Sequence, residues 1–202
     1  MHIAIEGIDG VGKTTLAKKL AKALNFKFVE KHLHTLFDGE NAEHIPHYQR
    51  ITKVINSSDD TLLRAWFYAL GNIYMREHYG NKDIVTDRYF ASNYSWNGTP
   101  DTSFIFEHLI QCLGKPQITF LLYANENARI NRLRQRNSND PDLEKINGTF
   151  SLEMYKKLKY FLDQYDFHYY RLDTSELSDT ETFETVLGII HQEFPGRFAK
   201  SS

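Results

Sequence analysis

The sequence of 202 residues predicts an α/β fold, in which a parallel β-sheet is covered by helices on both faces. Strand-like and helix-like segments alternate along the chain, which implies crossover connections between parallel strands. The strand-like segments are short, and several are apolar at consecutive positions, as in strands buried on both faces. A glycine-rich segment also separates the first of these strands from the first helix. This arrangement is typical of a sheet that binds a ligand at its edge.

Five strands and seven helices are expected. The strands are expected at 2–6, 27–31, 83–87, 117–123 and 168–174. Helical periodicity predicts helices near 14–24, 41–56, 60–79, 102–113, 125–136, 150–165 and 179–193. The polar segment 134–150 contains Pro141 and interrupts this periodicity, so we expect a surface loop that can move. No repeat or linker divides the chain, and a single domain over 1–202 is expected.

Composition and charge exclude several classes of protein. The chain is 41% hydrophobic and 25% charged, as folded domains are, and its net charge of −2 argues against binding a nucleic acid polymer. Its one cysteine, Cys112, cannot form an internal disulfide, which favours a reducing cytoplasm. No apolar run approaches the roughly 20 residues that span a bilayer. We therefore expect a soluble cytoplasmic protein without a membrane partner.

The segment from Gly7 to Thr14 matches the phosphate-binding loop pattern G-x-x-x-x-G-K-[ST] without a mismatch. Glycines let backbone N–H groups curl around a phosphate, and the following helix start adds partial positive charge. Lys13 can bridge the β- and γ-phosphates, and the Thr14 hydroxyl can coordinate Mg²⁺. The loop therefore predicts ATP and Mg²⁺ as cofactors. The residues expected to hold the nucleotide are Gly7, Asp9, Gly10, Val11, Gly12, Lys13, Thr14 and Thr15.

The third expected strand ends in Asp87, and Arg88 follows directly beyond it. Asp87 is suited to binding Mg²⁺ through water, and Arg88 would point into the crevice beyond the strand ends. There Arg88 could clamp an acceptor phosphate or the transferring γ-phosphoryl group. A structural ion pair is the alternative interpretation. Tyr89 and Trp96 follow and offer flat surfaces for a sugar or a base, although each is as compatible with a place in the core.

An arginine-rich helix precedes the polar loop. Arg129, Arg132 and Arg136 stand at helical spacing on one face of the segment 125–136. A basic helix that enters a movable loop can close over the phosphates and exclude water, which favours transfer over hydrolysis. Arg132 and Arg136 are therefore candidate catalytic residues beside Lys13. The alternative is a solvated basic helix face.

Together, IEGIDGVGKTT at 5–15, Asp87-Arg88-Tyr89 and the arginine-rich segment resemble the thymidylate kinase family over nearly the whole chain. The resemblance implies the three-layer P-loop NTPase fold, with a five-stranded parallel sheet in the order 2-3-1-4-5. It also implies transfer of the ATP γ-phosphoryl group to a nucleotide. Because the family is commonly dimeric, a homodimer is expected.

The resemblance assigns roles to acceptor-side residues. Asp9 matches the acid that faces the acceptor sugar, and Arg88 matches the arginine that engages the acceptor phosphate. Phe67 falls where the base-stacking phenylalanine of the family stands. Trp96 and Asn97 occupy the positions of an aromatic residue and an amide near the base and the sugar.

The chain also departs from the family. Four residues after the stacking phenylalanine, the family has an arginine that contacts thymine, whereas Gly71 stands there in this alignment. The segment after the second strand, 29–32, lacks the arginine of the family pattern. One lid arginine is lost at Pro141. A pocket without these contacts could accept something other than thymidylate.

Three functions therefore stay open. The favoured one is a kinase of a nucleoside monophosphate, preferably a pyrimidine deoxynucleotide. A deoxynucleoside kinase is the rival, because Glu30 stands where such enzymes place the carboxylate that takes the 5′-hydroxyl proton. Asp87-Arg88-Tyr89 argues against it, since those enzymes usually carry Glu-Arg-Ser. A degenerate module that binds ATP without transfer is the third. His32, His34, His44 and His47 cluster without a closed ligand pattern, so no metal site is expected there.

Overall fold

Five strands form one parallel sheet in the computed structural model, which describes residues 1–30, 33–39, 42–143, 146 and 148–198. The strands are β1 (His2–Gly7), β2 (Lys27–Val29), β3 (Ile84–Asp87), β4 (Ile118–Tyr123) and β5 (Tyr169–Asp173). Their order is β2-β3-β1-β4-β5, which confirms the expected fold class and order. All carboxyl ends therefore meet at one edge, where the glycine loop, Glu30 and Arg88 follow their strands.

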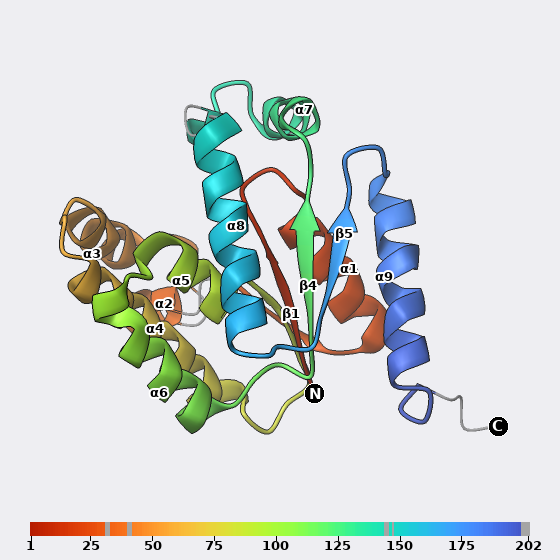
Figure 1. The fold of residues 1–202 in the computed structure, drawn as a ribbon, viewed down its shortest axis with the longest axis horizontal. Helices are drawn as coiled ribbons and strands as arrows, with labels where there is room; N and C mark the ends of the chain where they lie inside the picture. The colour runs from red at the N-terminus through yellow and green to blue at the C-terminus, as the bar shows by residue number, and fades with distance from the viewer. Residues whose placement is uncertain (31–32, 40–41, 144–145, 147, 199–202) are drawn as a thin grey trace.

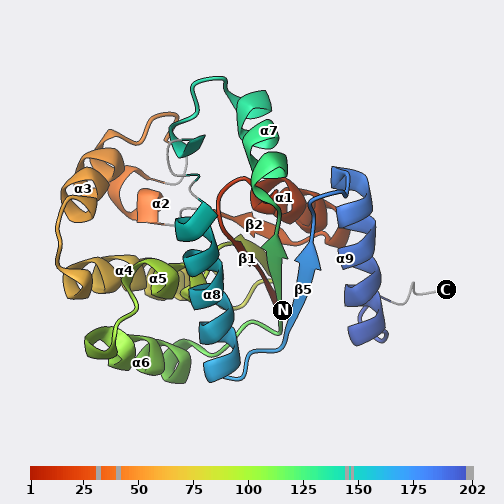
Figure 2. The ribbon, with the colours of Figure 1, turned by 45° about the horizontal axis from the view of Figure 1, so that its top comes forward.

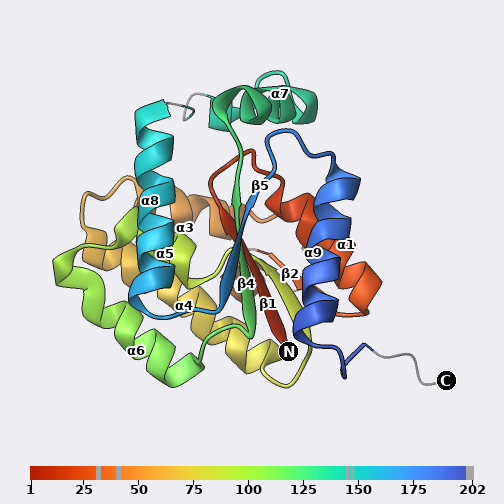
Figure 3. The ribbon, with the colours of Figure 1, turned by 45° about the vertical axis from the view of Figure 1, so that its right-hand side comes forward.

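Helices cover both faces of the sheet (Figure 1). The helices are α1 (Lys13–Leu24), α2 (Leu33–Asp38), α3 (Pro46–Asn56), α4 (Thr61–Tyr79), α5 (Phe90–Asn97), α6 (Ser103–Leu113), α7 (Glu126–Arg136), α8 (Gly148–Gln164) and α9 (Asp179–Glu193). Short 3₁₀ turns lie at Pro100–Thr102 and Pro141–Leu143. Helices α1 and α9 lie on one face, and α5 and α8 on the other, with α4 and α6 farther out (Figures 1 and 2). Helix α7 lies beyond the carboxyl ends of the strands (Figure 3).

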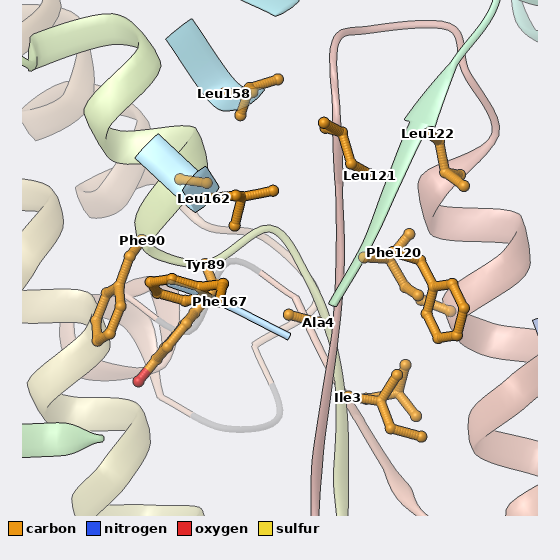
Figure 4. Close-up of a cluster of buried hydrophobic side chains, with 14 of the residues drawn as sticks. Ile3, Ala4, Tyr89, Phe90, Phe120, Leu121, Leu122, Leu158, Leu162 and Phe167 are labelled. Carbon is orange, nitrogen blue, oxygen red and sulfur yellow. The ribbon is translucent and has the colours of Figure 1, made fainter. Parts of the chain in front are cut away.

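The core is apolar on both sides of the sheet because helices cover both sides. Phe120 and Leu122 point to the side of α1, whereas Leu121 between them points to the side of α8 (Figure 4). All three side chains are fully buried. Leu158 and Leu162 of α8 complete the layer opposite Leu121. This is why β4 is apolar at consecutive positions rather than at alternate ones. Truncating a buried phenylalanine such as Phe120 to alanine costs about 3–5 kcal/mol.

Three expectations about the elements are corrected. The helix expected at 41–56 begins later, because α3 starts at Pro46 and a separate α2 precedes it; residue 41 lies outside the described residues. Proline lacks an amide proton and therefore fits the first turn of a helix, where none is needed. Helix α5 was not expected, since its few apolar residues give no clear period. The loop expected at 134–150 is shorter, because α7 continues to Arg136 and α8 begins at Gly148.

No helix in the described part of the chain has the length and apolar character needed to cross a membrane.

Candidate active site

The loop after β1 forms an open cradle. Gly10 and Gly12 adopt positive φ angles of 83° and 94°, which side chains with a Cβ atom disfavour. A Cβ atom at Gly10 would also come within 3.1 Å of the Cβ atom of Arg129. Gly12 caps α1 without a side-chain hydrogen bond, so amide groups of the first turn are left for an anion. The cradle therefore has the geometry and the partial charge that a phosphate group requires.

Lys13 lies buried under this loop. Its Nζ atom donates to the Ile8 carbonyl at 2.7 Å and lies 3.9 Å from Oδ1 of Asp9. Burial, reinforced by the positive charge of Arg88, lowers the pKa of Lys13 to about 8. The carboxylates of Asp87, Asp9 and Glu6 oppose this shift, so the buried ammonium group lies among acidic groups beside the loop.

Thr14 and Asp87 fit a magnesium site. The Thr14 hydroxyl donates to Oδ2 of Asp87, which joins the start of α1 to the end of β3. The second carboxylate oxygen of Asp87, Oδ1, is buried and has no hydrogen-bond partner in the described part of the chain. Mg²⁺ prefers oxygen ligands and retains water molecules, so a hydroxyl beside an unsatisfied carboxylate oxygen suits it.

Arg88 connects the cradle to the neighbouring cavity. Its guanidinium donates to the Asp9 carboxylate and to the Gly7 carbonyl, the latter at 3.4 Å. Its backbone has a φ of 76°, which is rare outside glycine, and its amide donates to the Ile5 carbonyl at 2.9 Å. Such strained backbone conformations cluster at functional sites.

Glu6 holds the segment after Arg88. This carboxylate is almost completely buried, and it accepts hydrogen bonds from the Tyr89 amide at 2.8 Å and the Ser92 amide at 3.3 Å. The Ser92 hydroxyl also donates to it. Tyr89, the N-cap residue of α5, provides no side-chain cap, so Glu6 supplies the missing acceptor from β1. Burial raises the pKa of Glu6, although its hydrogen bonds and Arg88 oppose the shift.

A cavity of about 530 Å³ opens beside Arg88, within the range of small-molecule sites. Of the predicted acceptor residues, it is lined by Glu30, Tyr89, Trp96 and Asn97, as well as by Arg88 itself. Its wall consists of Glu30, Leu33, Tyr48, Asn56, Arg64, Tyr68, Asn72, Asp87, Arg88, Tyr89, Ser92, Asn93, Trp96 and Asn97. The predicted acceptor residue Asp9 is not part of this wall, but Arg88 joins the cavity to Asp9 in the phosphate loop.

The expectation that Phe67 stacks on the acceptor base is corrected. It is not among the residues that line the cavity, and its ring instead stacks on Phe37 at a centroid distance of 6.2 Å. The next residue, Tyr68, faces the cavity. Asn72, four residues after Tyr68 on α4, lines the cavity as well. Helix rotation explains the error, because one residue turns a side chain by about 100°.

The arginines of α7 contact three different parts of the protein. Arg129 is buried and donates from Nε to the Asp9 carbonyl at 2.7 Å, so it supports the cradle. Arg132 instead donates to Oγ1 of Thr174 at 3.0 Å and to the Thr174 carbonyl, at the end of β5.

Arg136 is held by the segment that follows α7. Its Nε donates to Asp140 at 2.5 Å and its Nη2 to Asp142 at 3.0 Å. The expectation that Arg129, Arg132 and Arg136 act together is therefore corrected. Successive side chains of one helix face here reach the cradle, the end of β5 and the lid, because α7 lies across the strand ends.

Several site residues escaped the sequence analysis. Arg64 and Asn72 line the cavity from α4, and Glu6 and Ser92 support the segment after Arg88. Glu6 had a usable signal in the sequence, since it is the one acidic residue of β1 and directly follows the apolar run Ile3–Ile5. The described residues contain no group of three potential metal-ligating side chains, and His32 lies outside them.

Comparisons with known proteins agree with this geometry. The family model for thymidylate kinase matches residues 5–182. A probable thymidylate kinase from Metallosphaera sedula is 32% identical over 136 residues, 66% of each chain. One from Methanococcus maripaludis is 28% identical over 96% of both chains.

Solved structures share the fold. A thymidylate kinase from Candida albicans is similar with a TM-score of 0.67 at 14% identity, over 95% of this chain and 91% of that one. A deoxyadenosine kinase from M. mycoides has a TM-score of 0.65 at 17% identity, over 95% and 100%. Phosphate loop, acceptor cavity and family match lead to one conclusion: the chain belongs to the thymidylate kinase family and is an ATP-dependent nucleotide kinase.

Proposed function

We propose that this kinase transfers the γ-phosphoryl group of ATP·Mg²⁺ to a pyrimidine deoxynucleoside monophosphate. The observation that carries the proposal is the position of Arg88. Its guanidinium contacts Gly7 and Asp9 in the phosphate loop, and it also lines the 530 Å³ cavity. One cation therefore lies where a donor γ-phosphate and an acceptor phosphate would meet, and it can stabilise the charge that develops during transfer.

On the donor side, Lys13 and the loop amides bind the triphosphate, and Thr14 with Asp87 holds Mg²⁺, partly through water. The ion supplies neutralisation of the phosphate charges when it is bound. The residues proposed for ATP are Gly7, Asp9, Gly10, Val11, Gly12, Lys13, Thr14 and Thr15. The buried, unpartnered Oδ1 of Asp87 supports this assignment, because such an atom requires a ligand.

On the acceptor side, a monophosphate is already anionic, so the reaction requires positioning more than a strong base. Arg88 and Asp9 orient the phosphate and the sugar, while Trp96, Asn97 and Tyr68 enclose the base. As part of the same proposal, residues 1–202 form one kinase domain with a lid near 134–150. The lid brings Arg132 towards the phosphates when ATP is bound, whereas Arg136 stays paired with Asp140 and Asp142 within it.

The oligomer and the cellular location also belong to the proposal. We place the protein in the cytoplasm as a homodimer without a nucleic acid or membrane partner. Exposed apolar side chains along α4 support the dimer, since Trp66, Leu70 and Ile73 are each 40–45% exposed on one helix face.

A deoxynucleoside kinase is the second candidate, because Glu30 lines the cavity and could take a 5′-hydroxyl proton. The deoxyadenosine kinase from M. mycoides shares the fold. The choice between the two depends on whether the acceptor enters with a phosphate.

A screen of ADP release with ATP·Mg²⁺ over all nucleosides and nucleoside monophosphates tests the proposal. We expect turnover of pyrimidine deoxynucleoside monophosphates and at least about 100-fold slower turnover of the nucleosides. Turnover of thymidine but not thymidylate would instead establish the nucleoside kinase with Glu30 as its base. Tight ATP binding without any turnover would indicate a module that only binds ATP.

A matched pair of lysine variants controls the screen. Lys13→Ala removes the cation of the cradle, so activity with every acceptor should disappear. Lys22→Ala changes an exposed lysine of the same helix and should leave activity unchanged. Full activity of Lys13→Ala would overturn the proposed donor site.

A further inference from the structure

Asp38, the last residue of α2, caps the start of α3. Its Oδ1 atom accepts hydrogen bonds from the His47 amide at 3.0 Å and from Nδ1 of the His47 ring at 2.9 Å. Its Oδ2 atom accepts from the Tyr48 amide at 2.8 Å. Ile45, the N-cap residue of α3, provides no side-chain acceptor, so a carboxylate from another helix satisfies the amides of the first turn. Asp38 therefore fixes the place at which α3 begins.

The backbone amides contribute more to this link than the imidazole ring does. Only 2% of the Asp38 side chain is accessible, whereas 65% of the His47 side chain is accessible. An ion pair with so exposed a partner contributes little. Desolvation opposes the shift, but the hydrogen bonds from the amides of Tyr48 and His47 hold the pKa of Asp38 below its ordinary value. The carboxylate is therefore charged at neutral pH and binds the first turn of α3.

Burial contributes little to the position of α3. None of its residues is buried, and it packs mainly against α2 and α4 (Figures 1 and 2). At its other end, Oδ1 of Asn56 accepts a hydrogen bond from the Tyr68 hydroxyl of α4 at 2.7 Å. Most helices of globular proteins are stabilised by the packing of an apolar face. Because α3 lacks a buried face, its position depends on the polar contacts at its two ends.

Helix α3 nevertheless forms part of the acceptor site, because Tyr48 and Asn56 line the cavity. Burial raises the pKa of Tyr48 to about 12, and the neighbouring Tyr68 and Glu30 act in the same direction. The Tyr48 hydroxyl therefore stays protonated at neutral pH and can donate a hydrogen bond, while its ring offers a flat surface. Since Asp38 binds the amide of this same residue, a shift of the first turn would move the Tyr48 side chain in the cavity.

We infer that Asp38 is a positioning residue for the acceptor nucleotide: its carboxylate holds the first turn of α3 so that Tyr48 contacts the acceptor. This inference rests on the proposed function and adds to it a residue outside the active site. Asp38 does not line the cavity, so it acts on the acceptor only through α3. A displacement of about 1 Å that begins far from the chemistry can lower a rate by about 100-fold.

Steady-state kinetics with thymidylate and ATP test the inference. Asp38→Ala removes all three hydrogen bonds, so it should raise KM for thymidylate by about 10-fold. Asp38→Asn keeps the size of the side chain but only one acceptor oxygen, so its KM should be intermediate. KM for ATP should change less than about 3-fold in both variants, because no residue of α3 belongs to the proposed ATP site. Glu43→Ala removes an exposed carboxylate between α2 and α3 and is the control, which should change neither KM.

A double-mutant cycle separates positioning from a general loss of structure. If Asp38 acts through Tyr48, Asp38→Ala should change KM for thymidylate less than about 3-fold in a Tyr48→Ala background. Amide hydrogen exchange in Asp38→Ala should become faster in residues 46–56 and stay unchanged in β1 and β4. Two results would overturn the inference. One is that the effects of the two changes on KM multiply, and the other is an equal loss of affinity for ATP and thymidylate.

Failure of the proposed function can be told apart from failure of this inference. If nucleosides rather than monophosphates are turned over, the same variants are measured with thymidine, and the same rise in KM is expected because Tyr48 lines the cavity for either acceptor. If no acceptor is turned over, calorimetry measures thymidylate binding to the wild type and to Asp38→Ala. Binding that is about 10-fold weaker in the variant supports the inference. Equal binding, or no binding by the wild type, overturns it.

Discussion

The guanidinium of Arg88 donates to the carboxylate of Asp9, so the end of β3 is joined to the phosphate loop after β1. Asp9 and Arg88 lie 79 positions apart in the chain. They share one site because β1 and β3 are neighbours in the sheet. The pair is partly exposed, with 36% of the Arg88 side chain and 24% of that of Asp9 accessible. A ligand can therefore reach both groups.

Arg88→Met should lower kcat/KM for the acceptor by about 10²- to 10³-fold, because it removes a donor from the transferring phosphoryl group. Asp9→Asn should cost less, about 10-fold, since the arginine remains. A double-mutant cycle in kcat/KM measures their coupling, which neighbours in one network show at about 0.5–3 kcal/mol. Additive effects of the two changes would mean that the pair does not act as a unit.

The affinity for ATP should fall as pH rises through about 8. Lys13 is charged below its pKa, and burial lowers that pKa to about 8, so the free enzyme loses the cation above this value. Between about 8 and the ordinary value of 10.5, the unfolded chain binds a proton that the folded chain lacks, so this group makes stability rise with pH. Dissociation constants for MgATP between pH 6.5 and 9.5 check the prediction. A constant value across this range would contradict it.

Glu6→Gln should destabilise the fold by about 1–3 kcal/mol at neutral pH, because one charged acceptor serves the start of α5. It should also lower kcat through a misplaced Arg88. Glu77→Gln, an exposed change on α4, is the control. Urea unfolding and kinetics measure both effects, and a variant with unchanged stability and kcat would show that Glu6 does not position α5.

The carboxyl group of Glu6 also makes the stability of the fold depend on pH. Burial raises the pKa of Glu6 above its ordinary 4.5, so the folded state keeps the proton over an interval in which the unfolded chain has lost it. Its contribution to stability is therefore present below 4.5 and is lost as pH rises through the folded-state pKa. The free energy of unfolding of the wild type and of Glu6→Gln should be measured at several pH values. The pH-dependent contribution of Glu6 should be present only in the wild type.

Arg136→Met should lower kcat less than about 3-fold. The carboxylates of Asp140 and Asp142 already compensate the charge of this arginine, and the hydrogen bond that it donates to Asp140 raises the pKa of Arg136 above its ordinary value. Arg129→Met should lower kcat by 10-fold or more, because Arg129 supports the cradle at the Asp9 carbonyl. Single-turnover rates compare the two. A larger loss for Arg136 would show that the lid releases it onto the phosphates during transfer.

Leu70→Glu should convert the proposed homodimer into a monomer. Leu70 lies on the exposed apolar stripe of α4, between Trp66 and Ile73, and a buried charge there would be unpaired. Val54→Glu changes a more exposed apolar residue on α3 and should leave the assembly intact. Light scattering after size-exclusion chromatography measures the mass. A wild-type monomer, or a dimer that survives Leu70→Glu, would contradict the placement of the interface.

The sequence by itself determined the fold class and the donor end of the site. Local patterns carry that information: β1, the loop of Gly7–Gly12 and the start of α1 are contiguous, so Lys13 and Thr14 could be assigned from spacing alone. The strand ends at Glu30 and Asp87 were also readable, because parallel strands present their carboxyl ends at one edge. These interpretations need no knowledge of which helix packs where.

The tertiary structure alone decided the acceptor end. Phe67 and Tyr68 are adjacent in sequence, and only the rotation of α4 against its neighbours shows that Tyr68 faces the cavity. The same packing brings Arg64 to Asn97 and Glu6 to the start of α5, contacts between residues 33 and 83–86 positions apart. A hydrogen bond across that separation leaves no periodic trace in the sequence. Such a hydrogen bond depends on how the helices pack against the sheet, and this packing is defined only in the folded structure.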